Sequence, residues 1–179
     1  FRSRVSSPTH PMVVPRQAVE LIAGAYPRLT DAEQSRVDQS LAELKQFCDE
    51  HLDPERIDRE ADIPRGVIDG LGRLGVLGMT APADVGGRGF SQMAYCRILE
   101  EIGGRCSATS IFVNAHHSIG IRALLLFGTD EQKRTWLPEL VNAQKLAAFA
   151  LTEPEAGSDA SNVQTLATPT SDGHFVLNG

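Results

Sequence analysis

Apolar residues recur at helical spacing through most of the chain. Beginning with Thr30, the positions Val37, Leu41, Leu44 and Cys48 follow at intervals of four, three and four residues, which puts them on one face of a helix. Comparable stripes recur further along, often with Ser or Thr before the first turn and Gly after the last. The pattern predicts five helices, at about 30–51, 64–75, 91–102, 107–127 and 130–140.

Some of these helix ends carry a more specific signal. Thr30 with Glu33, and Thr129 with Gln132, have the spacing of a capping box, in which two side chains bond each other's backbone N–H groups. The pair Gly103–Gly104 is expected to end the third helix. The fourth helix is apolar nearly all round, which is typical of a helix at the centre of a bundle.

The pattern changes after Lys145. The uncharged run Leu146–Thr152 predicts a buried strand, and the alternation over Val163–Thr168 predicts a half-buried one. The turn-forming letters PTSDG separate this strand from another that begins at His174. Helices followed by strands predict an all-α domain and then the start of a β domain. We divide the chain into a flexible N-terminal segment, a helical domain and the start of a β domain, at 1–29, 30–145 and 146–179.

Composition narrows the possible partners. The 179 residues carry a net charge of -6, and proteins that bind nucleic acid as their main partner usually have a basic footprint instead. A phosphate-bearing small ligand remains possible, because backbone N–H groups bind phosphate. Three cysteines without a CxxC spacing indicate a reduced, intracellular setting. Metal-ligand spacing is also missing, since the adjacent His116 and His117 would point in different directions on a helix.

Two questions concern membranes and the ends of the chain. The apolar run Ile121–Phe127 is shorter than the ~20 residues that span a bilayer. The first nineteen residues hold three arginines and no acid, which fits either a mitochondrial transit segment or, the interpretation we favour, a disordered tail. The chain begins at Phe1 and stops at the strand-like letters FVLNG, so we expect it to be a piece of a longer protein.

The stretch Phe149–Asp159, FALTEPEAGSD, joins an apolar run to a polar turn. The hydroxyls of Thr152 and Ser158 can donate or accept hydrogen bonds, and Gly157 lets a ligand approach the backbone closely. Composition alone favours a solvated surface turn over a ligand site.

Three other arrangements have some chemical logic. Glu153 and Glu155 could act as a carboxylate pair, although the proline between them argues against a shared face. Ser158, Asp159 and His116 could form a triad, but a chain with five histidines offers such sets readily. The GGRG loop that begins at Gly86 could hold a phosphate, although glycine-rich loops usually only turn the chain.

The letters LTEPEAGSD closely resemble the flavin-contacting motif of acyl-CoA dehydrogenases, which has TEP, two variable residues and then GSD. Three further blocks resemble the family in the same order along the chain: DVGGRG, AHHSIGIRALLLFGTDEQKRTWLPEL and FVLNG. The resemblance covers about Asp31 to Gly179. The letters HHSIG and ALLLFGT look most like the very-long-chain branch of the family.

This resemblance implies a fold and a reaction. The expected fold class is an all-α N-terminal helical bundle followed by the start of a β-barrel-like middle domain, and the family adds a C-terminal four-helix domain. The implied cofactor is FAD, and the implied reaction converts an acyl-CoA thioester to its trans-2-enoyl-CoA. A flavin oxidase or monooxygenase of the same fold, or a non-catalytic assembly relative, are the alternatives.

The resemblance also implies roles for residues. Leu151 and Thr152 would meet the pyrimidine side of the flavin, Gly157 and Ser158 its phosphates, and Ser158 also the acyl-CoA. Glu153 would be structural, and Glu155, which stands where small residues are usual, is expected to point outward. The full set implied to contact the cofactor is Phe149, Ala150, Leu151, Thr152, Gly157 and Ser158.

The catalytic base implied by the family is a glutamate expected beyond Gly179. The 179 residues alone are therefore expected to be inactive. The family also implies an electron-transferring flavoprotein as electron acceptor, assembly as a homodimer or homotetramer, and a location in the bacterial cytoplasm or the mitochondrial matrix.

Overall fold

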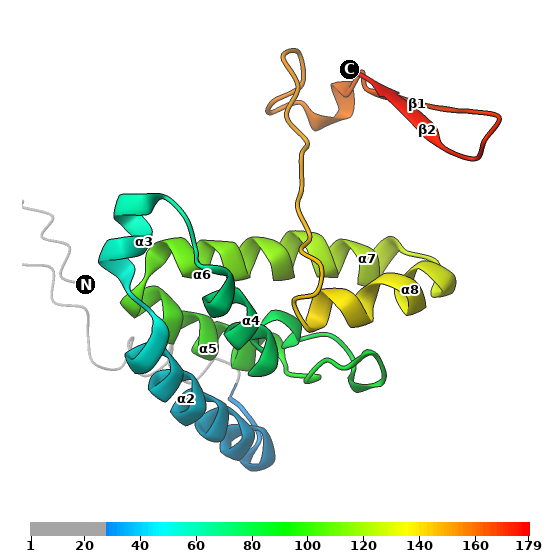
Figure 1. Ribbon diagram of the computed structural model, residues 1–179. Coiled ribbons are helices and arrows are strands. Elements are labelled where there is room, and N and C mark those ends of the chain that lie inside the picture. The colour runs from blue at the N-terminus through cyan, green and yellow to red at the C-terminus, as the bar shows by residue number, and fades with distance from the viewer. Residues whose placement is uncertain (1–27) are drawn as a thin grey trace, which may run out of the picture.

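The computed structural model describes residues 28–179, so the predicted flexible segment lies almost wholly outside the described residues. Helices come first and a two-stranded sheet last, as Figure 1 shows. The helices are α2 (Asp31–His51), α3 (Pro54–Glu60), α4 (Arg65–Arg73), α5 (Gln92–Arg105), α6 (Ser107–Asn114), α7 (Arg122–Phe127) and α8 (Asp130–Val141). Short helical turns are η1 (Val76–Gly78), η2 (Ala83–Val85), η3 (Ala115–Ile121) and η4 (Ala160–Asn162). The strands are β1 (Leu166–Pro169) and β2 (Phe175–Asn178). The predicted fold class, a helical bundle followed by the start of a β domain, is confirmed.

Local capping signals set the helix starts. The predicted capping box at Thr129 and Gln132 is present in full. At the start of α2 only half of the predicted box forms: the Thr30 hydroxyl accepts from the backbone N–H of Glu33. The Glu33 carboxylate instead accepts from the backbone N–H of Ser91, at 2.7 Å, and this bond lowers the pKa of Glu33. It therefore joins the beginnings of α2 and α5, a contact between distant parts of the chain that local spacing does not reveal.

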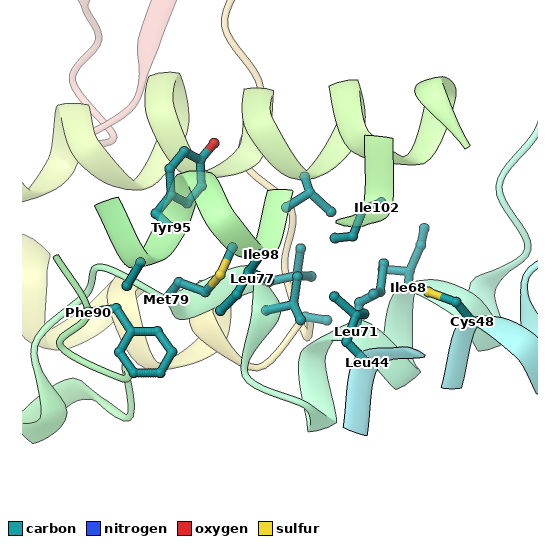
Figure 2. Close-up of a cluster of buried hydrophobic side chains, with 14 of the residues drawn as sticks. Leu44, Cys48, Ile68, Leu71, Leu77, Met79, Phe90, Tyr95, Ile98 and Ile102 are labelled. Atoms are coloured by element: carbon teal, nitrogen blue, oxygen red, sulfur yellow. The ribbon is translucent and has the colours of Figure 1, made fainter. Parts of the chain in front are cut away.

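The main core lies between α2, α4 and α5 and the loop after η1, beneath the long helical run of α6 and α7 (Figure 2). The apolar stripes predicted from spacing supply most of it. Leu44, Leu71, Leu77 and Ile102 are each at most 1% exposed. A smaller cluster joins Ile121 to the inner face of α8. Burial of these stripes is the main force that holds the helices together.

The predicted fourth helix is one continuous rod, but its middle is wound more widely. In η3 the helix is a π-helix, in which the backbone N–H of Arg122 donates to the carbonyl oxygen of His117, five residues earlier. One side of the rod stays open, because Ile111, Leu126 and Phe127 are 60–85% exposed; it is not the centre of a bundle within residues 28–179. By length and composition this rod could cross a membrane, which is weak evidence because core helices pass the same test.

Three elements differ from the sequence predictions. Helix α3 was not predicted, although Asp53 caps it and Pro54 stands in its first turn. Helix α5 runs past Gly103–Gly104 to Arg105, where ion pairs with Glu101 and Asp49 support its last turn. The predicted strand at 146–152 does not form, because no backbone in residues 28–179 pairs with it.

The last part of the chain forms an antiparallel hairpin that stands apart from the helical body in Figure 1. Leu166 pairs with Asn178 and Pro169 with Phe175, and Gly173 takes a φ of 83° in the turn. Both strands are exposed on both faces, so the first strand is not half-buried as its alternation predicted. A hairpin alone is marginally stable, since it has no second layer on which to bury its apolar side chains.

Candidate functional site

The candidate segment Phe149–Thr152 is extended and exposed. Phe149 is 58% exposed and Leu151 42%. Within residues 28–179, neither the N–H groups of Leu151 and Thr152 nor the Thr152 hydroxyl make a hydrogen bond. Extended backbone with free N–H donors and exposed apolar side chains suits contact with a ligand or with another part of a protein.

A tight turn follows this segment. The backbone groups of Glu153 and Ala156 exchange two hydrogen bonds of 3.2 Å, with Pro154 and Glu155 at the tip. Ala156 is fully buried, and Glu155 is exposed, as expected of a side chain that points outward. The turn fixes the direction in which the chain leaves Thr152.

The Glu153 carboxylate ties this turn to the beginning of the hairpin. It accepts hydrogen bonds from the backbone N–H groups of Gln164, at 2.7 Å, and Thr165, at 3.1 Å, and from the Thr165 hydroxyl. The hydroxyl and N–H bonds lower the pKa of Glu153, so the carboxylate stays ionised and keeps accepting these three bonds. This arrangement excludes the carboxylate pair considered from the sequence and agrees with a structural role.

Glu153→Ala is therefore expected to release the stretch around Gln164 and Thr165. Both amide N–H groups lose a charged acceptor, although solvent weakens such bonds at an exposed position. Hydrogen exchange at these two amides should accelerate about fivefold, measured by NMR on the chain. Glu155→Ala is the matched control, since it removes an exposed carboxylate two residues away. Unchanged exchange in Glu153→Ala would show that the three bonds do not hold the turn.

The residues after the turn are also open. An added Cβ at Gly157 would meet no atom within 4 Å, and Ser158 is exposed with no hydrogen bond from its hydroxyl in residues 28–179. Asp159 accepts from the Ser161 hydroxyl. The triad considered from the sequence does not form, because His116 is buried in the helical body and bonded elsewhere. What remains is a hydroxyl and a glycine backbone accessible to a ligand.

The glycine-rich loop does not present its backbone to a ligand. Its successive N–H groups, from Gly86 to Phe90, all donate inward to carbonyl oxygens of residues 78–83. The Arg88 side chain also turns inward, donating to the Leu74 carbonyl at 2.9 Å and lying over the Phe90 ring. A phosphate cradle needs free N–H groups, so this loop is a structural turn.

The two adjacent histidines of η3 are buried and serve different neighbours. Nε2 of His117 accepts from the backbone N–H of Thr80 at 3.2 Å, and burial lowers the pKa of His117 to about 4. Nδ1 of His116 accepts from the backbone N–H of Ala147 at 3.1 Å, while Nε2 lies 3.0 Å from the carbonyl oxygen of Leu140. Burial also lowers the pKa of His116. Both rings are therefore neutral parts of the framework.

Comparison with known proteins identifies the family. The family described as "Acyl-CoA dehydrogenase, N-terminal domain" matches residues 34–144, more than half of the chain. The chain belongs to the acyl-CoA dehydrogenase family. The matched residues end just before the segment that carries the candidate flavin contacts.

Individual family members extend the likeness past that point. The very long-chain specific acyl-CoA dehydrogenase, mitochondrial, of Macaca fascicularis is 38% identical over 156 residues, which is 86% of this chain and 24% of that protein. The probable acyl-CoA dehydrogenase FadE10 of Mycobacterium bovis is 40% identical over the same shares. An acyl-CoA dehydrogenase from Bacillus anthracis, solved complexed with FAD, superposes with a TM-score of 0.67 at 32% identity, covering 84% of this chain and 26% of that one.

The chain thus spans about a quarter of the length of these two curated relatives. Sequence reasoning overlooked the connection between η3 and Ala147. The one available signal was Gly120, a glycine inside a long helical pattern, which often marks close packing.

Proposed function

We propose that this chain is the N-terminal part of an FAD-dependent acyl-CoA dehydrogenase. In this proposal 30–145 is the helical domain, and 146–179 begins a β domain that continues in a longer protein. The exposed segment ending in Leu151 and Thr152, with its free N–H donors, is the observation that carries the proposal. The Bacillus anthracis relative solved complexed with FAD supports the choice of cofactor.

The residues present suit a flavin. The N–H groups of Leu151 and Thr152 and the Thr152 hydroxyl would donate to the pyrimidine side of the ring, and Phe149 and Ala150 would line it. Gly157 and Ser158 would lie near the phosphates, and Ser158 would also contact the acyl-CoA. Hydrogen-bond donors at the pyrimidine side stabilise negative charge that develops on the ring, which favours its reduction. Bound FAD would supply the acceptor for the hydride that leaves the substrate.

The base that removes the substrate's α-proton is proposed to come from residues beyond Gly179. Glu153 is a poor candidate, because its carboxylate is held by three hydrogen bonds and its pKa is lowered. We therefore infer that the 179 residues alone are inactive. We further propose that the full-length protein passes its electrons to an electron-transferring flavoprotein and assembles as a homodimer or homotetramer. Its proposed location is the mitochondrial matrix or the bacterial cytoplasm.

The test is anaerobic titration of the full-length protein with acyl-CoAs of several chain lengths. We expect bound FAD, bleaching of the flavin absorbance by acyl-CoA, and formation of the 2-enoyl product; the 179-residue chain should show no turnover. Thr152→Ala should weaken FAD binding about fivefold, because one hydrogen bond contributes about 1 kcal/mol. Thr170→Ala, in the hairpin turn, is the matched control.

Two outcomes would favour another function, and a third would place the catalytic base elsewhere. Full-length protein without FAD would indicate a non-catalytic assembly relative. Bleaching followed by rapid reoxidation in air, with peroxide or an oxygenated product, would indicate an oxidase or monooxygenase. Robust turnover by the 179-residue chain would place the base within it.

A further inference from the structure

The chain leaves the helical body at Ala147, and two residues of η3 meet it there. The Ala147 backbone N–H donates to Nδ1 of His116 at 3.1 Å. Gly120, one helical turn further along η3, faces the same residue: a Cβ built on Gly120 would collide with the Cβ of Ala147 and lie 3.4 Å from its Cα. One contact is a hydrogen bond and the other is close packing, so two independent observations place Ala147 against η3.

His116 joins this docking point to the end of α8. The ring is 1% exposed, and its Nε2 lies 3.0 Å from the Leu140 carbonyl oxygen. Since Nδ1 accepts from Ala147, the proton must be on Nε2, where it is donated to Leu140. The imidazole thus bridges the last turn of α8 and the residue at which the extended segment begins.

His116 and Gly120 both lie in the π-helical segment η3. The N–H of Arg122 bonds five residues back, and the Ser118 hydroxyl donates to the Asn114 carbonyl oxygen at 2.7 Å. A hydroxyl that bonds the backbone in this way competes with the regular helical ladder. π-turns of this kind often occur where a helix must present particular residues to a site.

Because Ala147 lies just before the candidate flavin-contacting segment, its contacts with η3 affect where that segment lies. In residues 28–179 no backbone hydrogen bond holds residues 148–152, and the next fixed point is the turn at Glu153. The free donors of Leu151 and Thr152 therefore lie on a short span between two anchors. A shift of the first anchor would move the donors directly.

We propose that His116 and Gly120 are positioning residues for the flavin contacts, acting through Ala147. This inference rests on the proposed function, because it assigns the purpose of the anchor to the cofactor segment. Neither residue touches the cofactor in this proposal. They set where Leu151 and Thr152 lie, by fixing the chain four residues earlier.

The anchor itself is tested without any cofactor. Hydrogen exchange at the Ala147 amide, followed by NMR on the chain, should be protected in the wild type and accelerate about tenfold in His116→Leu, which removes the acceptor. His116→Gln keeps one donor and one acceptor and should retain part of the protection. Equal exchange in all three proteins would overturn the anchor.

The consequence for the cofactor is tested in the full-length protein. Gly120→Ala should weaken FAD binding at least about tenfold and alter the flavin absorbance bands. The added Cβ would collide with the Cβ of Ala147, so Ala147 must shift and carry the flavin-contacting segment with it. Ala147→Gly in the same protein removes the colliding Cβ and should restore binding. Gly104→Ala is the matched control, since its Cβ would meet no atom within 4 Å.

Thermal unfolding separates positioning from general stability. Alanine is a better helix former than glycine, so Gly120→Ala should keep the helical domain folded while FAD binding falls. Unchanged FAD affinity in Gly120→Ala, or a loss that Ala147→Gly does not reverse, would overturn the proposal. A wild-type protein that binds no FAD would instead refute the proposed function and leave the exchange result at Ala147 intact.

Discussion

Gly87→Ala is expected to destabilise the helical body by about 3 kcal/mol. A Cβ at Gly87 would collide with the carbonyl group of Ala81 and lie 2.6 Å from the Cβ of Ala81. The obstacle is backbone, so no rotamer change can relieve it. The Gly87 N–H also donates to the Pro82 carbonyl oxygen at 2.9 Å, which prevents the loop from moving away without loss of that bond.

Urea unfolding of the chain, followed by circular dichroism, measures this effect. Gly66→Ala in α4 is the matched control, because its Cβ would meet no atom within 4 Å. The control should be stabilised by about 0.5–1 kcal/mol, since glycine costs that much in a helix. Equal stability of Gly87→Ala and the wild type would mean that the loop is not packed against Ala81.

Acidification is expected to remove about 3 kcal/mol of folding stability through His117 alone. In the unfolded chain the imidazole binds its proton near the ordinary pKa of 6.5, whereas burial holds the pKa of folded His117 at about 4. Above pH 6.5 both states are neutral and the stability is fully present. As the pH falls from 6.5 towards 4 only the unfolded state gains the proton, so stability is lost across that range and levels off below it.

The comparison of wild type with His117→Gln isolates this contribution. Glutamine does not titrate, and its side-chain oxygen can still accept from the Thr80 N–H. Carboxylates that titrate in the same range are common to both proteins, so they cancel in the difference between the two stability curves. The difference should change by about 3 kcal/mol between pH 7.5 and pH 4. Parallel curves would show that folding does not lower the pKa of His117.

The two neighbouring histidines show how far sequence reasoning reached. Their adjacency indicated that they point in different directions on a helix, and in the structure each ring contacts a different neighbour. Their partners could not be predicted, because Thr80 is 37 residues from His117 and Ala147 is 31 residues from His116. Helical periodicity describes only neighbours within a few residues.

The strand prediction at 146–152 was wrong, because composition does not decide whether a segment finds a neighbouring strand. An uncharged run at 146–152 has the composition of a buried strand, yet it is extended and unpaired in residues 28–179. Composition reports what a segment can bury, whereas strand formation depends on a hydrogen-bonding neighbour. The same segment holds the predicted cofactor contacts, whose role stays a proposal.

The sequence by itself determined most of the helices, the caps at Thr30 and Thr129, and the family, because these depend on spacing within a few residues or on an ordered set of motifs. The tertiary structure alone decided that the GGRG loop turns its N–H groups inward, that Glu33 bonds Ser91, and that His116 and Gly120 hold Ala147. These are contacts between segments far apart in the chain. Their geometry follows from the packing of whole helices, which no local pattern encodes.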